Sequence, residues 1–338
     1  MRVSSPRSRT AALAAGIALC AGGAGVAMAV GRLVPALNPM LIAIVLGASA
    51  ANSVAIPAWI RPGVEFSAKR LLRVGIAVLG LQLMFSDIVA LGWGVIAIVV
   101  AVVALGIAGT MYMGRLLGLP WTQRVLIACG FSICGAAAVA AADGVVKAKD
   151  EETVTAIALV VIFGSLMIPG IPLLAQSAGL DDRRSGMLAG GAIHEVAQVV
   201  AAGGVIGGGA LAVATVVKLA RVLMLAPVMA YLGIVQRRRA RDGGVHGAAA
   251  GKQPPIVPLF VIGFLVSVAV RSSGLLPDFV IDQAAHLQTA LLTTAMFALG
   301  LGVRIGLLRS VGPRPFVLAT ASTLWVVFIA FIGILLVG

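Results

Sequence analysis

Charged residues are scarce in this chain of 338 residues, at 11% against about 25% in ordinary soluble domains. That shortage excludes a soluble globular protein, and it accompanies 60% hydrophobic residues and a mean hydropathy of +1.10. The apolar runs are continuous and approach the length of about 20 residues that a membrane helix needs, whereas barrel strands alternate. The composition therefore predicts an all-α integral membrane protein.

Cysteine and histidine are equally rare, with three residues of each. Cys20, Cys129 and Cys134 lie in apolar segments without a CxxC pairing, so neither a disulfide framework nor a zinc site is indicated. Only 12 acidic residues oppose 25 basic ones, which gives a net charge of +13. A basic excess can signal nucleic-acid binding, but in a membrane protein it usually reflects cytoplasmic loops, so the location of the charges decides.

Eleven apolar segments are predicted to cross the membrane. If the N-terminus is cytoplasmic and each segment crosses once, 19 of the 25 basic residues fall on the inner side, Arg183 and Arg184 among them. Lys147 and Lys149 then lie outside. This bias predicts a multi-pass protein with a cytoplasmic N-terminus, whose partner is the lipid bilayer and not nucleic acid. The segments are residues 11–31, 39–56, 71–86, 90–112, 122–146, 152–176, 184–205, 208–234, 255–271, 279–303 and 315–337.

A first internal resemblance joins residues 70–92 to residues 290–312, around a shared Leu-Gly-Leu. These are the third and tenth segments, so an odd number of crossings sets them in opposite directions. Inverted repeats of this kind are typical of secondary transporters. The predicted organisation is one polytopic domain, residues 1–338, with residues 35–115 and 255–337 repeat-related around a central segment, residues 120–235.

A second resemblance lies inside the central segment. CGFSICGAAAVAAADGV, residues 129–145, aligns with AGGAIHEVAQVVAAGGV, residues 189–205, although much of the match is Ala and Gly. With every segment crossing once, the two stretches run in the same direction and form a direct repeat. If one of the stretches re-enters the membrane instead of crossing it, the repeat is not direct. The sequence leaves single crossing and re-entry both open.

Glycines interrupt both of these stretches: Gly130, Gly135, Gly190 and Gly191 lie mid-segment, where glycine weakens a helix by about 1 kcal/mol relative to alanine. They either let helices pack closely or break them. A helix that restarts within the membrane presents free N–H groups and a positive dipole end, which suits an anion. Ser132 is placed to cap such a start. Because both stretches carry glycines beside polar residues, we expect broken helices.

His194 and Glu195 stand together in an apolar run, where an acidic residue costs roughly 3 kcal/mol in lipid. On a continuous helix, His194 shares a face with Gln198 while Glu195 points about 100° away. Because Gln198 replaces the second histidine of a zinc-binding HExxH motif, we predict no metal, no cofactor and no enzymatic activity. A buried structural pair, a substrate site and a proton or coupling site all stay open. Asp143 marks either the end of a broken helix or the membrane interface.

Lys218 and Arg221 lie one helical turn apart near the middle of the next segment. Two cations on one face at that depth are poorly explained as side chains that reach toward the lipid headgroups. They are expected to neutralise Glu195, to hold an anionic substrate, or to do both.

Four stretches together carry a family resemblance: CGFSICGAAAVAAADGVVKAKDEE, GGAIHEVAQVVAAGG, VKLARVLMLAP and ALGLG. From about residue 30 onward the chain resembles the YeiH-like family of bacterial inner-membrane proteins, which are described as sulfate exporters. The resemblance implies a multi-pass transporter with inverted repeats and crossed or broken helices that handles a small sulfur oxyanion. The positions that coincide with the family's polar signatures are Ser132, His194, Glu195, Lys218 and Arg221.

The resulting hypothesis is a secondary transporter in the bacterial inner membrane, exporting a small inorganic anion such as sulfate or sulfite. Proton coupling and a homo-oligomeric state are both left open. The alternatives are an anion channel and, less well supported, an intramembrane enzyme. The predicted substrate-binding residues are Gly130, Ser132, Gly135, His194, Lys218 and Arg221, and the predicted coupling or proton residues are Asp143, His194, Glu195 and Gln198.

Overall fold

The computed structural model describes residues 6–33, 39–242, 259–302 and 312–337. Within these ranges all regular structure is helical, as the composition predicts, and no strand occurs. The elements are α1 (Pro6–Leu33), α2 (Pro39–Ser53), η1 (Ala58–Ile60), α3 (Arg61–Phe66), η2 (Ser67–Leu71), α4 (Leu72–Leu79), η3 (Gly80–Gln82), α5 (Phe85–Ala90), α6 (Trp93–Leu116), α7 (Trp121–Cys129), η4 (Gly130–Cys134), α8 (Ala136–Val146), α9 (Asp150–Ser177), α10 (Asp182–Ala192), α11 (Val196–Ile206), α12 (Gly208–Leu223), α13 (Leu225–Asp242), α14 (Leu259–Ser272), α15 (Asp278–Gly300) and α17 (Arg314–Val337).

Five of the described helical stretches are long and apolar enough to cross a membrane alone. They lie within α1, α6, α9, the consecutive helices α12 and α13, and α17. The helices α2, α14 and α15 and the composite run from η1 to η3 pack beside them. This arrangement establishes a helical membrane protein.

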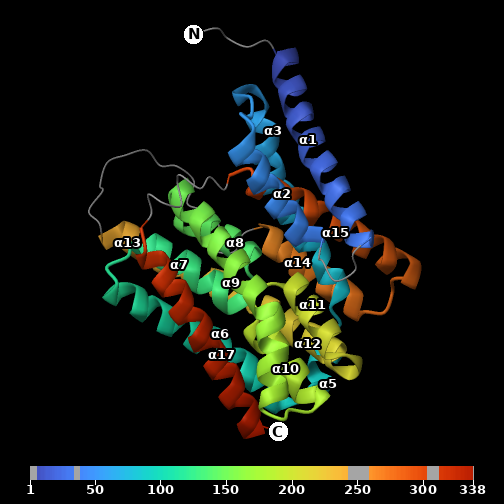
Figure 1. Ribbon diagram of the computed structural model, residues 1–338, viewed down its shortest axis with the longest axis vertical. Coiled ribbons are helices and arrows are strands. Elements are labelled where there is room, and N and C mark those ends of the chain that lie inside the picture. The colour runs from blue at the N-terminus through green and yellow to red at the C-terminus, as the bar shows by residue number, and fades with distance from the viewer. Residues whose placement is uncertain (1–5, 34–38, 243–258, 303–311, 338) are drawn as a thin grey trace.

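The helices form two lobes (Figure 1). The terminal lobe contains α1 to α4, α14 and α15, and the hairpin lobe contains α6 to α13 and α17, with few contacts between them. Small residues let the backbones of the terminal lobe approach closely: a Cβ atom on Gly47 would overlap the Phe297 carbonyl oxygen, and one on Gly300 would overlap that of Ile44. The hairpin lobe holds both stretches that the sequence marks as interrupted.

The first interrupted stretch, α7 to α8, folds back on itself. The Thr122 hydroxyl, at the start of α7, donates to Glu152 at the start of α9 over 2.7 Å. One turn before the break, a Cβ atom on Gly130 would lie 3.0 Å from Val160 of α9. Helix α7 therefore runs alongside α9 in the same direction. Because α9 begins shortly after α8 ends, α8 must have returned to the side where α7 begins.

The second interrupted stretch, α10 to α11, folds back in the same way. A Cβ atom on Gly186 would overlap the Ala210 carbonyl oxygen, and one on Gly190 would overlap that of Ala214. Helices α10 and α12 therefore run side by side in the same direction. Since α12 follows α11 directly, α11 has returned to the side where α10 begins.

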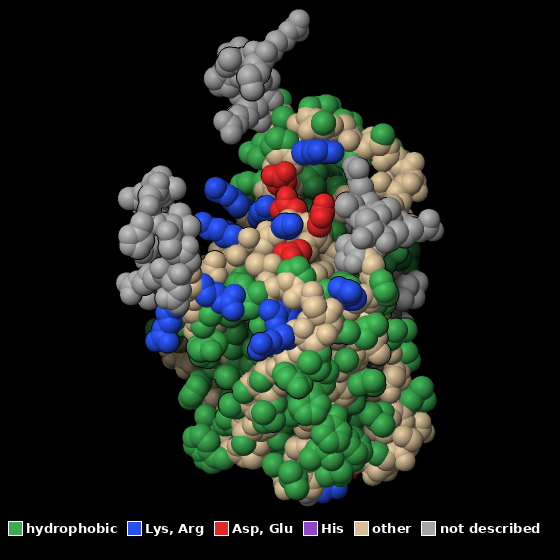
Figure 2. Space-filling model, turned by 90° about the vertical axis from the view of Figure 1, so that its left-hand side faces the viewer, with side chains coloured by type: hydrophobic (Ala, Val, Ile, Leu, Met, Phe, Trp, Pro, Cys, Tyr) green, Lys and Arg blue, Asp and Glu red, His purple; other side chains and the backbone are tan. Residues whose placement is uncertain are grey.

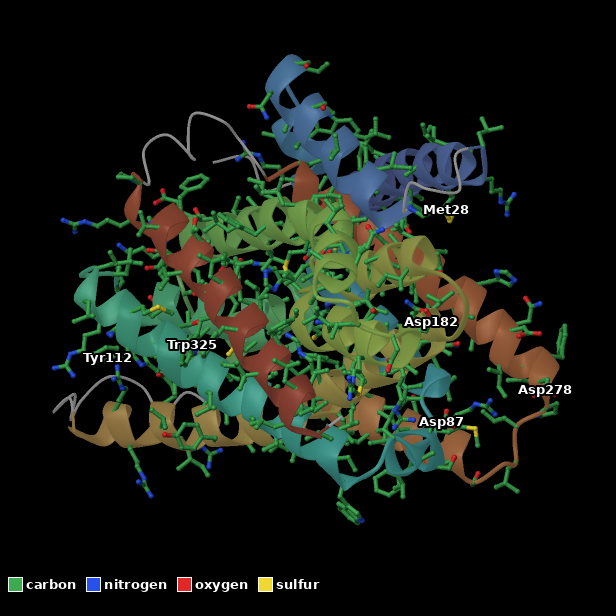
Figure 3. All side chains as sticks on the ribbon, turned by 60° about the horizontal axis from the view of Figure 1, so that its bottom comes forward. Met28, Asp87, Tyr112, Asp182, Asp278 and Trp325 are labelled. Atoms are coloured by element: carbon green, nitrogen blue, oxygen red, sulfur yellow. The ribbon has the colours of Figure 1, made fainter. Side chains whose placement is uncertain are left out.

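The two hairpins enter from opposite sides of the protein. Helix α9, which connects them, has 28 residues and a length of about 42 Å. Arg183, at the start of α10, donates from Nη2 to the Leu91 carbonyl oxygen just before α6. Figure 3 shows Asp87, Asp182 and Asp278 toward one side of the molecule and Tyr112, near the end of α6, toward the other. We call the side where α1 and α7 begin the first side, and the other the second side.

This arrangement bears on the two alternatives that the sequence leaves open for the central stretches. Residues 122–146 and 184–205 each fold back on themselves, and because they do so from opposite sides of the protein their relation is inverted and not direct. The start of α10, with Arg183 and Arg184, lies on the side opposite to the one expected, and so does the turn after α8, with Lys147 and Lys149. Arg183 and Arg184 change sides in one direction and Lys147 and Lys149 in the other. The number of basic residues on each side is therefore unchanged, and the charge bias could not reveal the difference.

Charged side chains gather on the face that Figure 2 presents, above a largely apolar region. On the first side, Lys69, Asp143, Asp150 and Gly302 line one cavity, which brings together the ends of η2, α8 and α15 and the start of α9. Helices α4 and α15 run antiparallel, because Arg73 near the start of α4 shares one cavity with Gly302 just after α15, whereas Leu79 at the end of α4 shares another with Gln288, nearer the start of α15. The repeat relation itself stays a prediction, because residues 303–311 lie outside the described residues. So do Arg2, Lys252, Arg304 and Arg309.

Candidate functional site

The first hairpin turns at a glycine with left-handed backbone geometry. Helix α7 continues into η4, a wider π-helical turn, and Gly135 follows with φ +75° before α8 begins at Ala136. Residues with a side chain rarely adopt this conformation, so glycine is required here. Ser132 lies in η4 and not at the start of α8. The expectation that Ser132 caps this start is therefore wrong. The N-cap position is occupied by Gly135, which has no side chain to cap the helix.

The second hairpin turns at three residues, 193–195, between the end of α10 and the start of α11. Ile193 and Glu195 have extended backbone dihedrals. Helices α8 and α11 begin at Ala136 and Val196. These positions are 60 residues apart, which is the offset of the second sequence resemblance. The break also overturns the expected shared helical face of His194 and Gln198, because His194 precedes the helix that holds Gln198.

Lys218 of α12 joins the two breaks. Its fully buried ammonium group donates to the carbonyl oxygens of Ile133 and Ile193, both over 2.8 Å. One acceptor belongs to each hairpin. Helix α12 therefore contacts both interrupted stretches at their breaks.

Arg221 lies one turn further along α12 and is also fully buried. Its guanidinium donates five hydrogen bonds, all to backbone carbonyl oxygens where η4 and α10 end. Nε bonds Ser132 over 3.2 Å, Nη2 bonds Phe131 over 3.1 Å, and Nη1 bonds Gly190, Gly191 and Ile193 over 3.0, 2.8 and 2.9 Å.

The two cations thus occupy the negative ends of two broken helices. Carbonyls at a helix C-terminus lack partners within the helix and carry about half a negative charge. Lipid offers no donors to such carbonyls, and here the charged side chains supply them. Among the described residues, Lys218 and Arg221 donate to carbonyls alone and form no ion pair with Glu195.

Glu195 lies at the opposite ends, where α8 and α11 begin. Its Oε1 accepts from the backbone N–H of Ala136, the first residue of α8, over 3.1 Å. It is also the N-cap of α11 in a capping box with Gln198, whose Oε1 accepts from the Glu195 N–H over 3.2 Å. Glu195 therefore lies at the positive ends of both restarted helices, with its carboxylate bonded to the first N–H of α8.

The other predicted residues point elsewhere. The His194 ring bonds the Phe131 carbonyl oxygen through Nδ1 and Thr323 of α17 through Nε2, both over 3.2 Å. Gln198 packs against Gly164 of α9, where a Cβ atom would overlap its amide. The Ser132 hydroxyl is fully buried and has no hydrogen-bond partner among the described residues. Gly190 and Gly191 lie within α10 and pack on α12 and α17.

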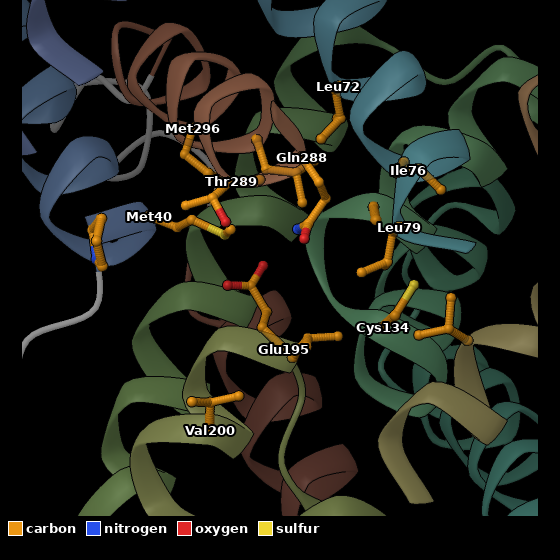
Figure 4. Close-up of a pocket in the computed structure, with 15 residues that line it drawn as sticks. Met40, Leu72, Ile76, Leu79, Cys134, Glu195, Val200, Gln288, Thr289 and Met296 are labelled. Carbon is orange, nitrogen blue, oxygen red and sulfur yellow. The ribbon is translucent and has the colours of Figure 1, made fainter. Parts of the chain in front are cut away.

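A cavity of about 260 Å³ opens between the two lobes beside Glu195 (Figure 4). Since a water molecule takes about 30 Å³ of liquid, there is room for a small hydrated anion. Its walls are largely apolar. The residues with polar or sulfur side-chain atoms that line it are Met40, Cys134, Glu195, Gln288, Thr289 and Met296.

Gln288 and Thr289 of α15 and Cys134 of η4 are additions that the sequence did not single out. Figure 4 shows Glu195 pointing into the cavity from the hairpin lobe and Gln288 pointing into it from the terminal lobe. A glutamine and a threonine in an amphipathic stretch carry no distinctive motif, so only the fold could bring them to Glu195. Ser132, His194, Lys218 and Arg221 do not line this cavity.

Asp143 is separate from this group. It lines a second cavity of about 250 Å³ on the first side, with Glu65, Lys69, Arg73 and Asp150. Both cavities lie between α4 and α15 on one side and the first hairpin on the other. Asp143 therefore lies along the interface between the lobes, nearer the first side than Glu195. The described residues contain no group of three or more His, Cys, Asp or Glu that could hold a metal ion.

Comparison with known proteins identifies the family. The model of a family described as conserved hypothetical protein 698 matches residues 15–319. A UPF0324 membrane protein of Corynebacterium glutamicum is 54% identical over 95% of this chain and 92% of its own length. Relatives from Agrobacterium fabrum and Bacteroides thetaiotaomicron, also UPF0324 membrane proteins, are 37% and 38% identical over 89% and 86% of this chain and 84% and 87% of their own. The chain therefore belongs to this YeiH-like family of UPF0324 membrane proteins.

Proposed function

We propose that this protein is a secondary transporter that exports a small inorganic anion such as sulfate or sulfite from the cytoplasm. The observation that carries the proposal is the meeting of two oppositely inserted hairpins beside a cavity between two lobes. Interrupted helices that present their termini to a site at mid-membrane are the usual binding architecture of secondary transporters. In this proposal the first side is the cytoplasmic face of the bacterial inner membrane.

The net charge of the region where the two hairpins meet α12, which we call the centre, favours the binding of an anion. Lys218 and Arg221 bring two positive charges and Glu195 one negative charge into the interior. The negative ends of η4 and α10 and the positive ends of α8 and α11 each count for about half a charge and cancel. One positive charge is left over. The cations act through this potential and not by touching the ligand, because their N–H groups are bonded to carbonyls.

Electrical energy sets the direction. With the cell interior negative, a dianion that leaves the cell gains about 2 × 2.3 kcal/mol per 100 mV. Export therefore needs no coupled ion, whereas uptake would require one. The two lobes supply a means of alternating access, since few contacts have to change when one lobe moves against the other.

An anion channel is the second candidate, and saturation separates the two. Purified protein in liposomes should release radiolabelled sulfate or sulfite at fixed voltage, with a rate that saturates as the internal anion concentration rises. A rate that stays proportional to concentration would favour the channel. Absence of flux for a panel of small anions would refute both.

A matched pair of variants tests whether the anion passes through the cavity beside Glu195. Leu292 is buried and lines the cavity, whereas Leu324 of α17 is exposed on the outer surface. Leu292→Trp should fill the cavity and abolish flux, while Leu324→Trp should leave flux within about twofold of wild type. Size-exclusion profiles and thermal stability in detergent report whether each variant is folded. Normal flux through a folded Leu292→Trp protein would show that the anion takes another route.

A further inference from the structure

We propose that the Glu195 carboxylate is a tethered anion that occupies the position needed by the transported anion, so that the transported anion binds by displacing it. The inference rests on the proposed function and adds how the same site is occupied and released. In this inference Glu195 competes with the substrate for the same site. The sequence had instead predicted a role for Glu195 in proton transfer or coupling.

The first observation is the convergence of two helix N-termini on one residue, Glu195. Glu195 accepts from the first N–H of α8 and caps α11, each a helix of 11 residues. Each terminus offers unpaired N–H groups and about half a positive charge, which is the arrangement that binds anions in proteins. A Cβ atom at Gly135 would overlap the Glu195 side chain, so the glycine leaves the space that this side chain fills.

The second observation is an unpartnered donor that faces the same place. Gln288 is 9% exposed, forms no hydrogen bond within the described part of the chain, and lines the cavity. Its amide points into the cavity opposite the Glu195 carboxylate, with Thr289 beside it (Figure 4). An amide that faces a largely apolar cavity without a protein partner gains from any hydrogen-bonding group that enters the cavity. It is therefore suited to receive either the displaced carboxylate or an oxygen of the incoming anion.

The balance of charge indicates that the Glu195 carboxylate and the transported anion do not occupy the site at the same time. Lys218 and Arg221 are held by their carbonyl partners, so this proposal keeps them in place whichever anion is present. The centre has an excess of one positive charge with Glu195 in place. A dianion beside a bound carboxylate would meet strong repulsion at this depth, where charges are weakly screened. If the carboxylate swings toward Gln288, both helix termini become free for the anion.

The test measures the binding of radiolabelled sulfate to the purified full-length protein in detergent. Glu195→Ala removes the competitor, and Glu195→Gln removes its charge while an amide oxygen still accepts from Ala136. Both should bind sulfate at least about tenfold more tightly than wild type, Glu195→Ala the more so. Glu151→Gln makes the same change at an exposed position in the first turn of α9 and should stay within about twofold of wild type.

The outcomes separate this inference from the proposed function. If wild type binds sulfate and both Glu195 variants, shown to be folded by their thermal stability, bind it equally or more weakly, Glu195 is not a competitor and the inference fails alone. Weaker binding by both variants would instead identify Glu195 as a residue that assists the anion. If neither wild type nor any variant binds sulfate or sulfite, the proposed function fails for these anions together with the inference.

Discussion

Arg221 gives the sharpest prediction for stability, because one side chain satisfies five backbone carbonyl oxygens from two hairpins. Hydrogen bonds to a charged donor contribute about 1.5–3 kcal/mol each, so the gross interaction is on the order of 10 kcal/mol. Burying the guanidinium costs several kcal/mol, which offsets much of it. Removal of one partner of a buried charged network typically costs about 3–5 kcal/mol, and we expect this loss for Arg221→Ala.

The measurement is reversible denaturation of the purified protein in detergent. Arg221→Met should be nearly as unstable as Arg221→Ala, because the orphaned acceptors belong to the backbone and remain. Arg221→Lys keeps the charge but reaches fewer carbonyls, so it should lie between. Arg238→Ala, on an exposed part of α13, is the control and should change the free energy of unfolding by less than about 0.5 kcal/mol. If Arg221→Met unfolds with a free energy within about 1 kcal/mol of wild type, the carbonyls do not depend on Arg221.

Two further predictions concern topology and packing. In a background whose native cysteines are replaced, a membrane-impermeant thiol reagent applied to whole cells should label the variant Asp182→Cys and not Ala148→Cys, and the reverse pattern would restore a single crossing for each segment. Gly190→Ala should destabilise the protein by about 1–3 kcal/mol because its methyl group would overlap α12, whereas Gly204→Ala, with open space around it, should be neutral or stabilising by up to about 1 kcal/mol. Equal stability of the two glycine variants would contradict the close approach of α10 and α12.

The sequence predicted the membrane class and the helical fold from composition, and it predicted interrupted helices from four mid-segment glycines. Of these, Gly135 lies at a break, whereas Gly190 and Gly191 serve close packing within α10 and the second break falls at residues 193–195. The sequence could not predict the re-entry of the two hairpins. A stretch of about 24 apolar residues has the length of one crossing whether or not it folds back at its middle. Basic residues at 147, 149, 183 and 184 exchange sides without changing the total, so the charge bias is blind to the difference.

The sequence also drew attention to the polar residues but could not assign their partners. Lys218 and Arg221 were expected to face a carboxylate or a substrate, and they bond carbonyl oxygens instead. Backbone acceptors carry no signature in the sequence, since every residue has one. Gln288 was missed for a related reason: its place depends on how the terminal lobe docks, about 90 residues along the chain from Glu195.

The long separation between the carbonyls and their donors has a consequence for biosynthesis. The acceptors at residues 131–133 are made 85 to 90 residues before Lys218 and Arg221. At ribosomal rates of about 5–20 residues per second, the first hairpin waits roughly 4–18 s for its donors. During that time its tip has exposed carbonyls that lipid cannot satisfy. The first hairpin must therefore stay at a watery or chaperoned site beside the insertion machinery until α12 emerges, so the insertion of α12 is the step that commits both hairpins to the membrane.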